Sequence, residues 1–243
     1  MKYFSSTILL LIVAFIGAAF SKPIDKSVKG AHFDRIVSII FENANYDESL
    51  PQPYFQDLIN HDNAHDIPGN NLVDLLEAKG VSWKGYMEDY PGHCYKDAFA
   101  PSNSSQLYAR KHNPFMSMIN INTNSTRCDK IVDLDQLDLD IETGDVPQYA
   151  YIVPNQIHDG HGIKGSPQNI TSAVEWFKGW FEPKLKKPTF TLFFIYFDED
   201  DHPKSDTNHI FAALLGHPVH PPSDHTDDTH YTLYSFLATV EEN

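Results

Sequence analysis

The feature that most constrains the fold is a pair of almost continuously apolar segments that both stop at acidic side chains. The first is residues 36–41, at the end of a strand predicted over 33–41, and Glu42-Asn43 follows it directly. The second is residues 189–197, followed by Asp198-Glu199. Runs without polar alternation are typical of strands buried on both faces of a parallel sheet. We therefore expect both segments to be interior strands.

Helical and extended patterns alternate along the rest of the chain. The predicted helices cover residues 72–78 and 172–185, and additional strands are predicted at 81–86, 149–153 and 210–215. This alternation predicts an α/β fold with a largely parallel sheet flanked by helices. Ligands of such sheets bind beyond the carboxyl ends of the strands. Polar residues that follow the strands are therefore the candidates for a site.

Two of these strand ends carry oxygen ligands. If the strands are adjacent, Glu42-Asn43 and Asp198-Glu199 lie on one rim of the sheet. Three carboxylates placed together repel one another unless a cation neutralises them. Oxygen ligands suit a hard divalent metal ion, which can polarise a phosphoryl oxygen. The alternative is that these acids only begin solvated loops.

A third strand end adds imidazole groups. The strand at 149–153 is followed by a glycine-containing loop that includes His158, Asp159 and His161. Two histidines and an acid at this position form a candidate set for metal ligation or phosphate contact. A histidine in such a loop can also be an ordinary loop residue, so the case depends on three strand ends carrying functional side chains together.

The N-terminal sequence predicts export. Lys2 precedes an uncharged apolar run over residues 8–20, and small residues follow it, which predicts a signal peptide over residues 1–21. An uncleaved anchor is the alternative. Residues 22–32 form a polar leader, and we expect one domain over 33–243. A chain of this organisation is expected outside the cell or in the cell wall.

Cysteines and sequons agree with export. The chain has two cysteines, Cys94 and Cys128, for which one disulfide is favoured over two free thiols. Glycosylation sequons begin at Asn103, Asn124 and Asn169. We therefore expect a disulfide-bonded glycoprotein.

The formal net charge of −15 limits the partners. Nucleic acids and anionic membrane surfaces select clustered Lys and Arg, so neither is expected as a partner. The sequence contains no second apolar run like residues 8–20, and no transmembrane segment is expected in the mature chain.

Taken in order, several segments resemble the phosphoesterase family of secreted fungal acid phosphatases and bacterial phospholipases C, in the alkaline phosphatase superfamily. The similar segments are Phe33–Val37 through Glu42-Asn43, Tyr108–Phe115, Val153–Asn155 with Asp159–His161, Phe197–Glu199, and His230-Tyr231 through Thr239–Glu241. No single motif is decisive, but the ordered set is specific.

The resemblance implies an alkaline-phosphatase-like fold and hydrolysis of phosphate esters through a phosphorylated Ser or Thr. The expected substrate is a small phosphorylated molecule or a phospholipid head group. By position in the motifs, Glu42, Asn43, Asp198 and Glu199 are the expected metal ligands, with the identity of the metal open. By the same transfer, His112, Asp159 and His161 are expected to be catalytic, by contacting phosphate or transferring a proton. For His112, a structural role in the His-Asn-Pro turn is the alternative.

The chain departs from the family pattern in two places. The segment that carries the nucleophile is not found: we expect the chain to be shortened near 58–65, and no Ser or Thr occurs between Leu50 and Val81. A central strand region is expected to be lost with it, and the C-terminus to be truncated. The alternatives are therefore a catalytically inactive secreted relative that binds a metal or a phosphorylated ligand, or an extracellular interaction protein without a site.

Overall fold

The computed structural model describes residues 30–41, 66–101, 105–163, 170–185, 191–198, 210–220, 226–227 and 229–243. Several predictions concern residues outside these ranges: the signal peptide, most of the leader, the shortened region near 58–65, Glu42, Asn43, Glu199, Asn103 and Asn169.

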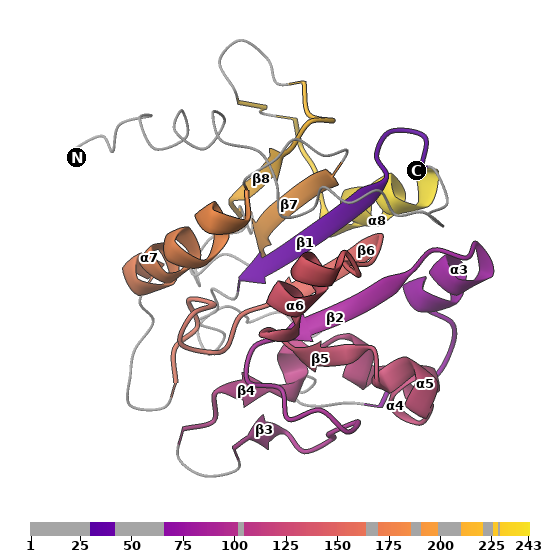
Figure 1. The fold of residues 1–243 in the computed structure, drawn as a ribbon, viewed down its shortest axis with the longest axis vertical. Coiled ribbons are helices and arrows are strands. Elements are labelled where there is room, and N and C mark those ends of the chain that lie inside the picture. The colour runs from indigo at the N-terminus through magenta and orange to yellow at the C-terminus, as the bar shows by residue number, and fades with distance from the viewer. Residues whose placement is uncertain are drawn as a thin grey trace, which may run out of the picture.

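Six strands form one continuous sheet in the order β5-β2-β6-β1-β7-β8 (Figure 1). They are β1 (Arg35–Phe41), β2 (Trp83–Met87), β5 (Ile131–Asp133), β6 (Tyr149–Val153), β7 (Thr191–Phe197) and β8 (Ala212–Leu215). Every neighbouring pair is parallel except β7 with β8, which is antiparallel. β3 (Phe99–Ala100) and β4 (Tyr108–Ala109) form a separate antiparallel pair. The predicted α/β class with a largely parallel sheet is confirmed.

The helices connect these strands and are mostly short. They are α3 (Leu72–Ala78), α4 (Ile119–Asn122), α5 (Ser125–Cys128), α6 (Gln136–Thr143), α7 (Ile170–Phe181) and α8 (Leu233–Glu242), with 3-10 turns η2 (Arg110–His112), η3 (Phe115–Ser117) and η4 (Glu182–Lys184). The predicted helix at 72–78 matches α3. Asn71 caps it by accepting from the N–H of Val73 at 3.0 Å, while Asp74 accepts from the N–H of Asn71 at 2.8 Å.

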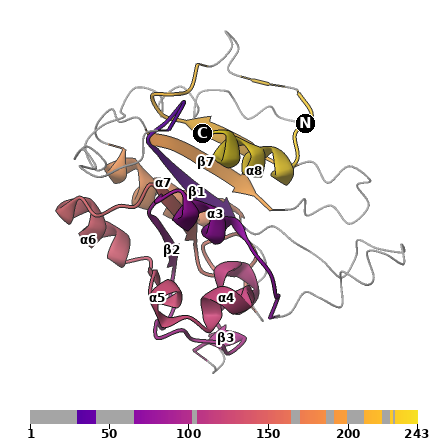
Figure 2. The same cartoon turned by 90° about the vertical axis from the view of Figure 1, so that its right-hand side faces the viewer.

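The sheet is buried on both faces. Ile36 and Ile40 of β1 face a cluster that includes side chains of α3, α4 and α8, while Val37 and Ile39 face a cluster with α6 and α7. Figure 2 shows the sheet between these two groups of helices. All seven residues of β1 are buried, which explains its apolar sequence without alternation.

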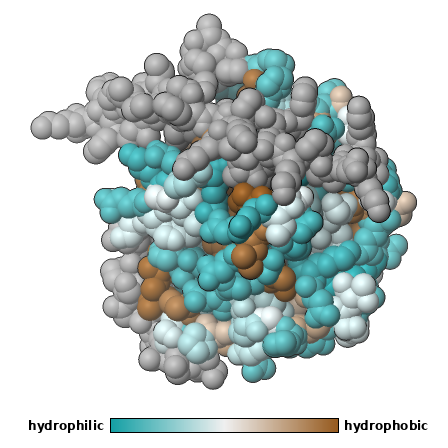
Figure 3. Space-filling view, viewed as in Figure 1, coloured by the Kyte–Doolittle hydropathy of each residue, from teal (hydrophilic) through white to brown (hydrophobic). Residues whose placement is uncertain are grey.

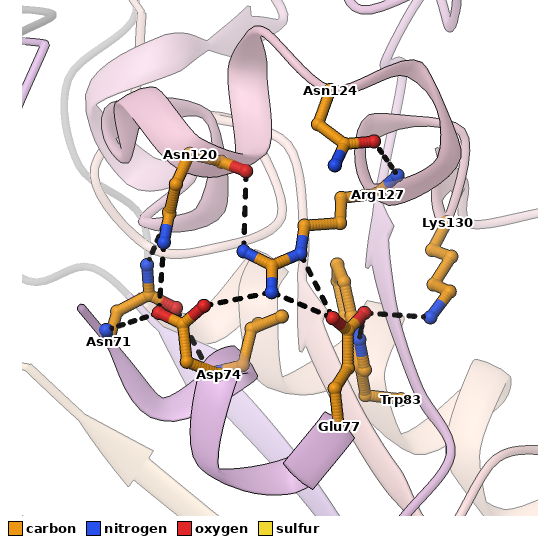
Figure 4. A network of polar contacts seen from close by, with 9 residues as sticks. Asn71, Asp74, Glu77, Trp83, Asn120, Asn124, Arg127 and Lys130 are labelled. Carbon is orange, nitrogen blue, oxygen red and sulfur yellow. Dashed lines mark hydrogen bonds and ion pairs between the residues drawn. The ribbon is translucent and has the colours of Figure 1, made fainter. Parts of the chain in front are cut away.

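The amino-terminal edge of the sheet is held by a polar network around Arg127 (Figure 4). Its guanidinium donates to Glu77 at 2.8 and 3.0 Å and to Asp74 at 2.8 Å. Glu77 also accepts from Trp83 at 3.0 Å and Lys130 at 3.1 Å. Since α3 leads into β2 and α5 leads into β5, the network joins the starts of two neighbouring strands.

A disulfide joins Cys94 and Cys128, with 5.3 Å between their Cα atoms. It connects the loop after β2 to the end of α5. The predicted disulfide is therefore confirmed.

The coloured surface in Figure 3 is mainly hydrophilic, with small and separate hydrophobic areas. Among the described residues, no helix is long and apolar enough to cross a membrane.

Candidate active site

The carboxyl ends of β2, β6, β1 and β7 lie at one edge of the sheet (Figure 1). β1 and β7 are in register, with Phe41 opposite Phe197, and the N–H of Asp198 donates to the carbonyl of Phe41 at 3.1 Å. The chain thus leaves both strands at the same level. Of the four predicted metal ligands only Asp198 is among the described residues, so the convergence of the set stays a prediction.

The turn η2 and the loop after β6 bring His112 and Asp159 together. Nδ1 of His112 lies 3.3 Å from Oδ2 of Asp159. Both residues are buried, with 8% and 0% exposure. The N–H of His161 donates to Oδ1 of Asp159 at 2.7 Å, and the His112 and His161 rings are 5.4 Å apart. The three residues predicted to be catalytic therefore lie in one cluster, while their roles stay predictions.

Burial is the dominant influence on Asp159. It raises the pKa of this carboxyl from 3.8 to about 7, because the charged form loses its hydration. The N–H of His161, and the charges of His161 and Lys111, act in the opposite direction. The charge of Glu88 raises the pKa further. Asp159 therefore titrates in the range where a general acid or its partner is useful.

Glu88 was not among the predicted site residues, although it lies directly beyond β2. Its carboxylate oxygens lie 2.9 and 3.0 Å from Nδ1 of His158, and Oε2 accepts from the N–H of Asn155 at 2.8 Å. The strand was predicted over 81–86, two residues short of Glu88, so the available signal was only an acid close to the end of a predicted strand.

Two hollows differ in their suitability for catalysis. A small one of about 10 Å³, the size of one water, is lined by residues that include Glu88, His112 and Pro154 at the carboxyl edge. A larger one of about 550 Å³ lies between α3, α8 and the amino-terminal ends of β1 and β6, and its lining is mostly apolar. His112 lines the small hollow, so the residues predicted to be catalytic lie on that side of the sheet.

Within the described ranges, the only group of three ligand-type side chains close enough to hold a metal is Cys94, Cys128 and Asp129. Both cysteines are consumed by the disulfide. Thiolates are therefore not available there, and this group is not a metal centre.

The sequence model of the Phosphoesterase family matches residues 44–243. The chain belongs to the Phosphoesterase family. The match begins just after Glu42-Asn43 and covers the loop of Asp159 and the segment of His112. The family resemblance expected from the sequence is thereby confirmed.

Relatives of the chain include fungal acid phosphatases. The chain is 36% identical to an acid phosphatase of Aspergillus fumigatus over 76% of this chain and 42% of the relative. It is 35% identical to a probable acid phosphatase of Kluyveromyces lactis over 82% of this chain and 47% of the relative. A phosphatidylinositol-3-phosphatase of Mycobacterium tuberculosis is 24% identical over 70% of this chain. The chain thus spans less than half the length of the two fungal relatives.

Proposed function

We propose that the chain hydrolyses phosphate esters, as an acid phosphatase does, with His112 as the group that protonates the leaving oxygen. The observation that carries the proposal is the buried His112–Asp159 pair at the carboxyl edge of the sheet. Similarity to acid phosphatases supports the reaction class. The inactive alternative has no such support.

The number of protons shared by His112 and Asp159 explains why this pair can donate a proton at acid pH. Below a pH of about 7, the value to which burial raises the pKa of Asp159, the pair holds two protons. Either both are on His112 and Asp159 is ionised, or Asp159 is neutral and its proton faces Nδ1. In both arrangements Nε2 of His112 carries a proton. Above that pH, Asp159 is ionised, Nδ1 holds the remaining proton and Nε2 has none to give.

In the proposed reaction, one water molecule is consumed for each phosphate ester that is hydrolysed. As a water molecule attacks phosphorus, a new P–O bond to the water oxygen forms while the ester P–O bond breaks, and the electron pair of the ester bond goes to the leaving oxygen. That oxygen takes the proton from Nε2 of His112 and leaves as an alcohol. Hydrolysis with one water releases phosphate and restores the proton on the pair. The proposal concerns the leaving-group side of this reaction.

A divalent metal ion is part of the proposal, with Glu42, Asn43, Asp198 and Glu199 as its ligands. Carboxylate and amide oxygens fit such an ion, and the in-register ends of β1 and β7 support a common location. When bound, the ion would polarise a phosphoryl oxygen and offset the charge of the carboxylates. Its identity is not part of the proposal.

The biological setting is proposed from the sequence. A signal peptide over 1–21 and a leader over 22–32 precede the domain at 33–243, and the protein acts outside the cell or in the cell wall. Glycans on its sequons belong to the same proposal. The substrate is a small phosphorylated molecule or a phospholipid head group.

The decisive experiment compares two leaving groups. Protonation matters most for a poor leaving alkoxide, so His112→Asn should reduce kcat on glycerol 2-phosphate by about 10²–10⁴-fold. The reduction on 4-nitrophenyl phosphate should be much smaller, because nitrophenolate leaves without a proton.

Glu42→Ala is the matched variant at the predicted metal set, and it should reduce kcat on both substrates alike. Equal losses on both substrates in His112→Asn would contradict the role of His112. Binding of inorganic phosphate by the wild-type protein without turnover of either ester would favour the inactive alternative.

A further inference from the structure

Glu88 joins the end of β2 to the loop that carries the candidate catalytic acid. Its Oε2 accepts from the N–H of Asn155 at 2.8 Å, and its two oxygens lie 2.9 and 3.0 Å from Nδ1 of His158. Asn155 and His158 belong to the loop 154–162 that contains Asp159. One carboxylate therefore holds this loop at two points.

A second set of contacts shapes the same loop. Oδ1 of Asn155 accepts from the N–H groups of Ile157 at 2.9 Å and His158 at 3.0 Å. Its Nδ2 donates to Asp89 at 2.7 Å, and its carbonyl accepts from the N–H of Asp159 at 2.8 Å. The conformation of the turn before Asp159 thus depends on the two acids beyond β2.

The imidazole of His158 is also held on its face. It stacks on Trp176 of α7 with 4.7 Å between ring centroids and 8° between planes. Trp176 stacks on Trp180 at 5.4 Å, and Lys184 lies over the Trp180 ring at 4.7 Å. The ring of His158 therefore cannot turn away from Glu88 without losing its stacking contact with α7.

We propose that Glu88 is a positioning residue of this site, whose contacts with Asn155 and His158 hold the loop so that Asp159 faces His112. The inference rests on the proposed hydrolysis only for its effect on turnover. The geometric part, the alignment of Asp159 with His112, can be tested in a protein that turns over nothing.

Glu88 also acts on Asp159 through its charge. The charged and titratable groups that face Asp159 are His161 of the same loop, Lys111 and His112 of η2, and Glu88 beyond β2. After burial, which has the largest effect, Glu88 is the group that raises the pKa of Asp159, while His161 and Lys111 lower it. Removing the charge of Glu88 should therefore move the titration of the pair to lower pH.

The test uses two variants that separate charge from geometry. Glu88→Gln keeps an oxygen acceptor for Asn155 but loses the charge, and His158→Phe keeps the stack on Trp176 but loses the contact with Glu88. We expect kcat on glycerol 2-phosphate to fall about 10-fold in each, with KM within twofold, because alignment affects the transition state rather than binding. The double variant should lose little more than either single one.

The pH profile adds a result that a purely structural role would not produce. In Glu88→Gln the alkaline limb of kcat should move to lower pH by roughly half a unit to one unit. The matched control is Glu77→Gln, since Glu77 is also a half-buried carboxylate with several donors, at the opposite edge of the sheet. We expect that control to lose stability without any shift of the limb.

The geometric part is measured by nitrogen-15 NMR of the imidazoles in the full purified chain. Glu88→Ala should shift the His112 ring signals, because Asp159 is no longer aligned, whereas Glu77→Ala should leave them in place. Unchanged His112 signals together with an unshifted pH limb in Glu88→Gln would overturn the inference. A wild-type protein without turnover would overturn the proposed function alone, and the NMR comparison would then decide on Glu88.

Discussion

Nδ1 of His112 faces Oδ2 of Asp159 at 3.3 Å, and Asp159 has no exposed surface. The two residues come from separate parts of the chain, the turn after β4 and the loop after β6. A fully buried acid holds its proton to higher pH than an exposed acid does, because burial removes the hydration of the charged form. This relationship connects the site to measurable effects of pH on both activity and stability.

The first prediction concerns the pH dependence of activity. Because Nε2 of His112 is protonated only while the pair holds two protons, kcat on an alkyl phosphate should fall as the pH rises through about 7, to which burial raises the pKa of Asp159. Asp159→Asn should displace this limb, because the imidazole of His112 then titrates without the buried carboxyl, and it should lower kcat at every pH. Measurement of kcat between acid and mildly alkaline pH checks both. A limb that stays at the same pH in Asp159→Asn would assign it to another group.

The second prediction concerns stability. The folded-state pKa of Asp159, about 7, lies above its ordinary value of 3.8, so the folded protein keeps a proton that the unfolded chain loses. The stabilising contribution is thus complete below about pH 3.8 and is lost as pH rises to about 7. In a His112→Asn background, where the imidazole of the pair no longer titrates, Asp159→Asn should gain roughly 2 to 4 kcal/mol between these limits. Denaturant unfolding at several pH values measures this difference, and a constant difference would contradict it.

The sequence predicted the parts of the fold that depend on local pattern. β1 and β7 were recognisable because burial on both faces requires apolar runs, and α3 because the helical pattern ends at Lys79-Gly80. β5 was missed since it has only three residues, and α4 and α5 since four-residue helices show no periodicity. These short elements are defined by tertiary contacts rather than by their own sequence.

The sequence named His112, Asp159 and His161 as candidates, but it could not show that His112 and Asp159 are buried against each other. Asp159 sits beside Gly160, and such a loop normally indicates an exposed acid. Asp159 is instead completely buried, with His112 of η2 against it, and no local pattern reveals this. Glu88 is an acid close to a predicted strand end, but its contacts with Asn155 and His158 become visible only in the folded structure.

The third prediction concerns the network in Figure 4. Arg127 neutralises Asp74 and Glu77 at the same time, so Arg127→Ala leaves two half-buried carboxylates close together, with one hydrogen bond fewer on Asp74 and two fewer on Glu77. We expect a loss of roughly 2 kcal/mol in the free energy of unfolding. Arg127→Lys should recover part of it, because it keeps the charge but not the forked geometry. Because the network is at the amino-terminal edge of the sheet, kcat of the folded variants should stay within twofold of wild type. A larger fall in kcat would show that the network also affects the candidate site at the carboxyl edge.

The fourth prediction concerns the disulfide, whose cysteines are separated by 34 positions. Closing a loop of this length removes conformational entropy from the unfolded chain, worth about 4 kcal/mol in the loop-closure model. The double variant Cys94→Ser with Cys128→Ser should therefore lose a few kcal/mol of unfolding free energy, measured by denaturant titration. Reduction of the wild-type protein should give a similar loss, while adding reductant to the double variant should change nothing. If reduced and oxidised wild-type proteins unfold at the same denaturant concentration, the cross-link does not stabilise the fold.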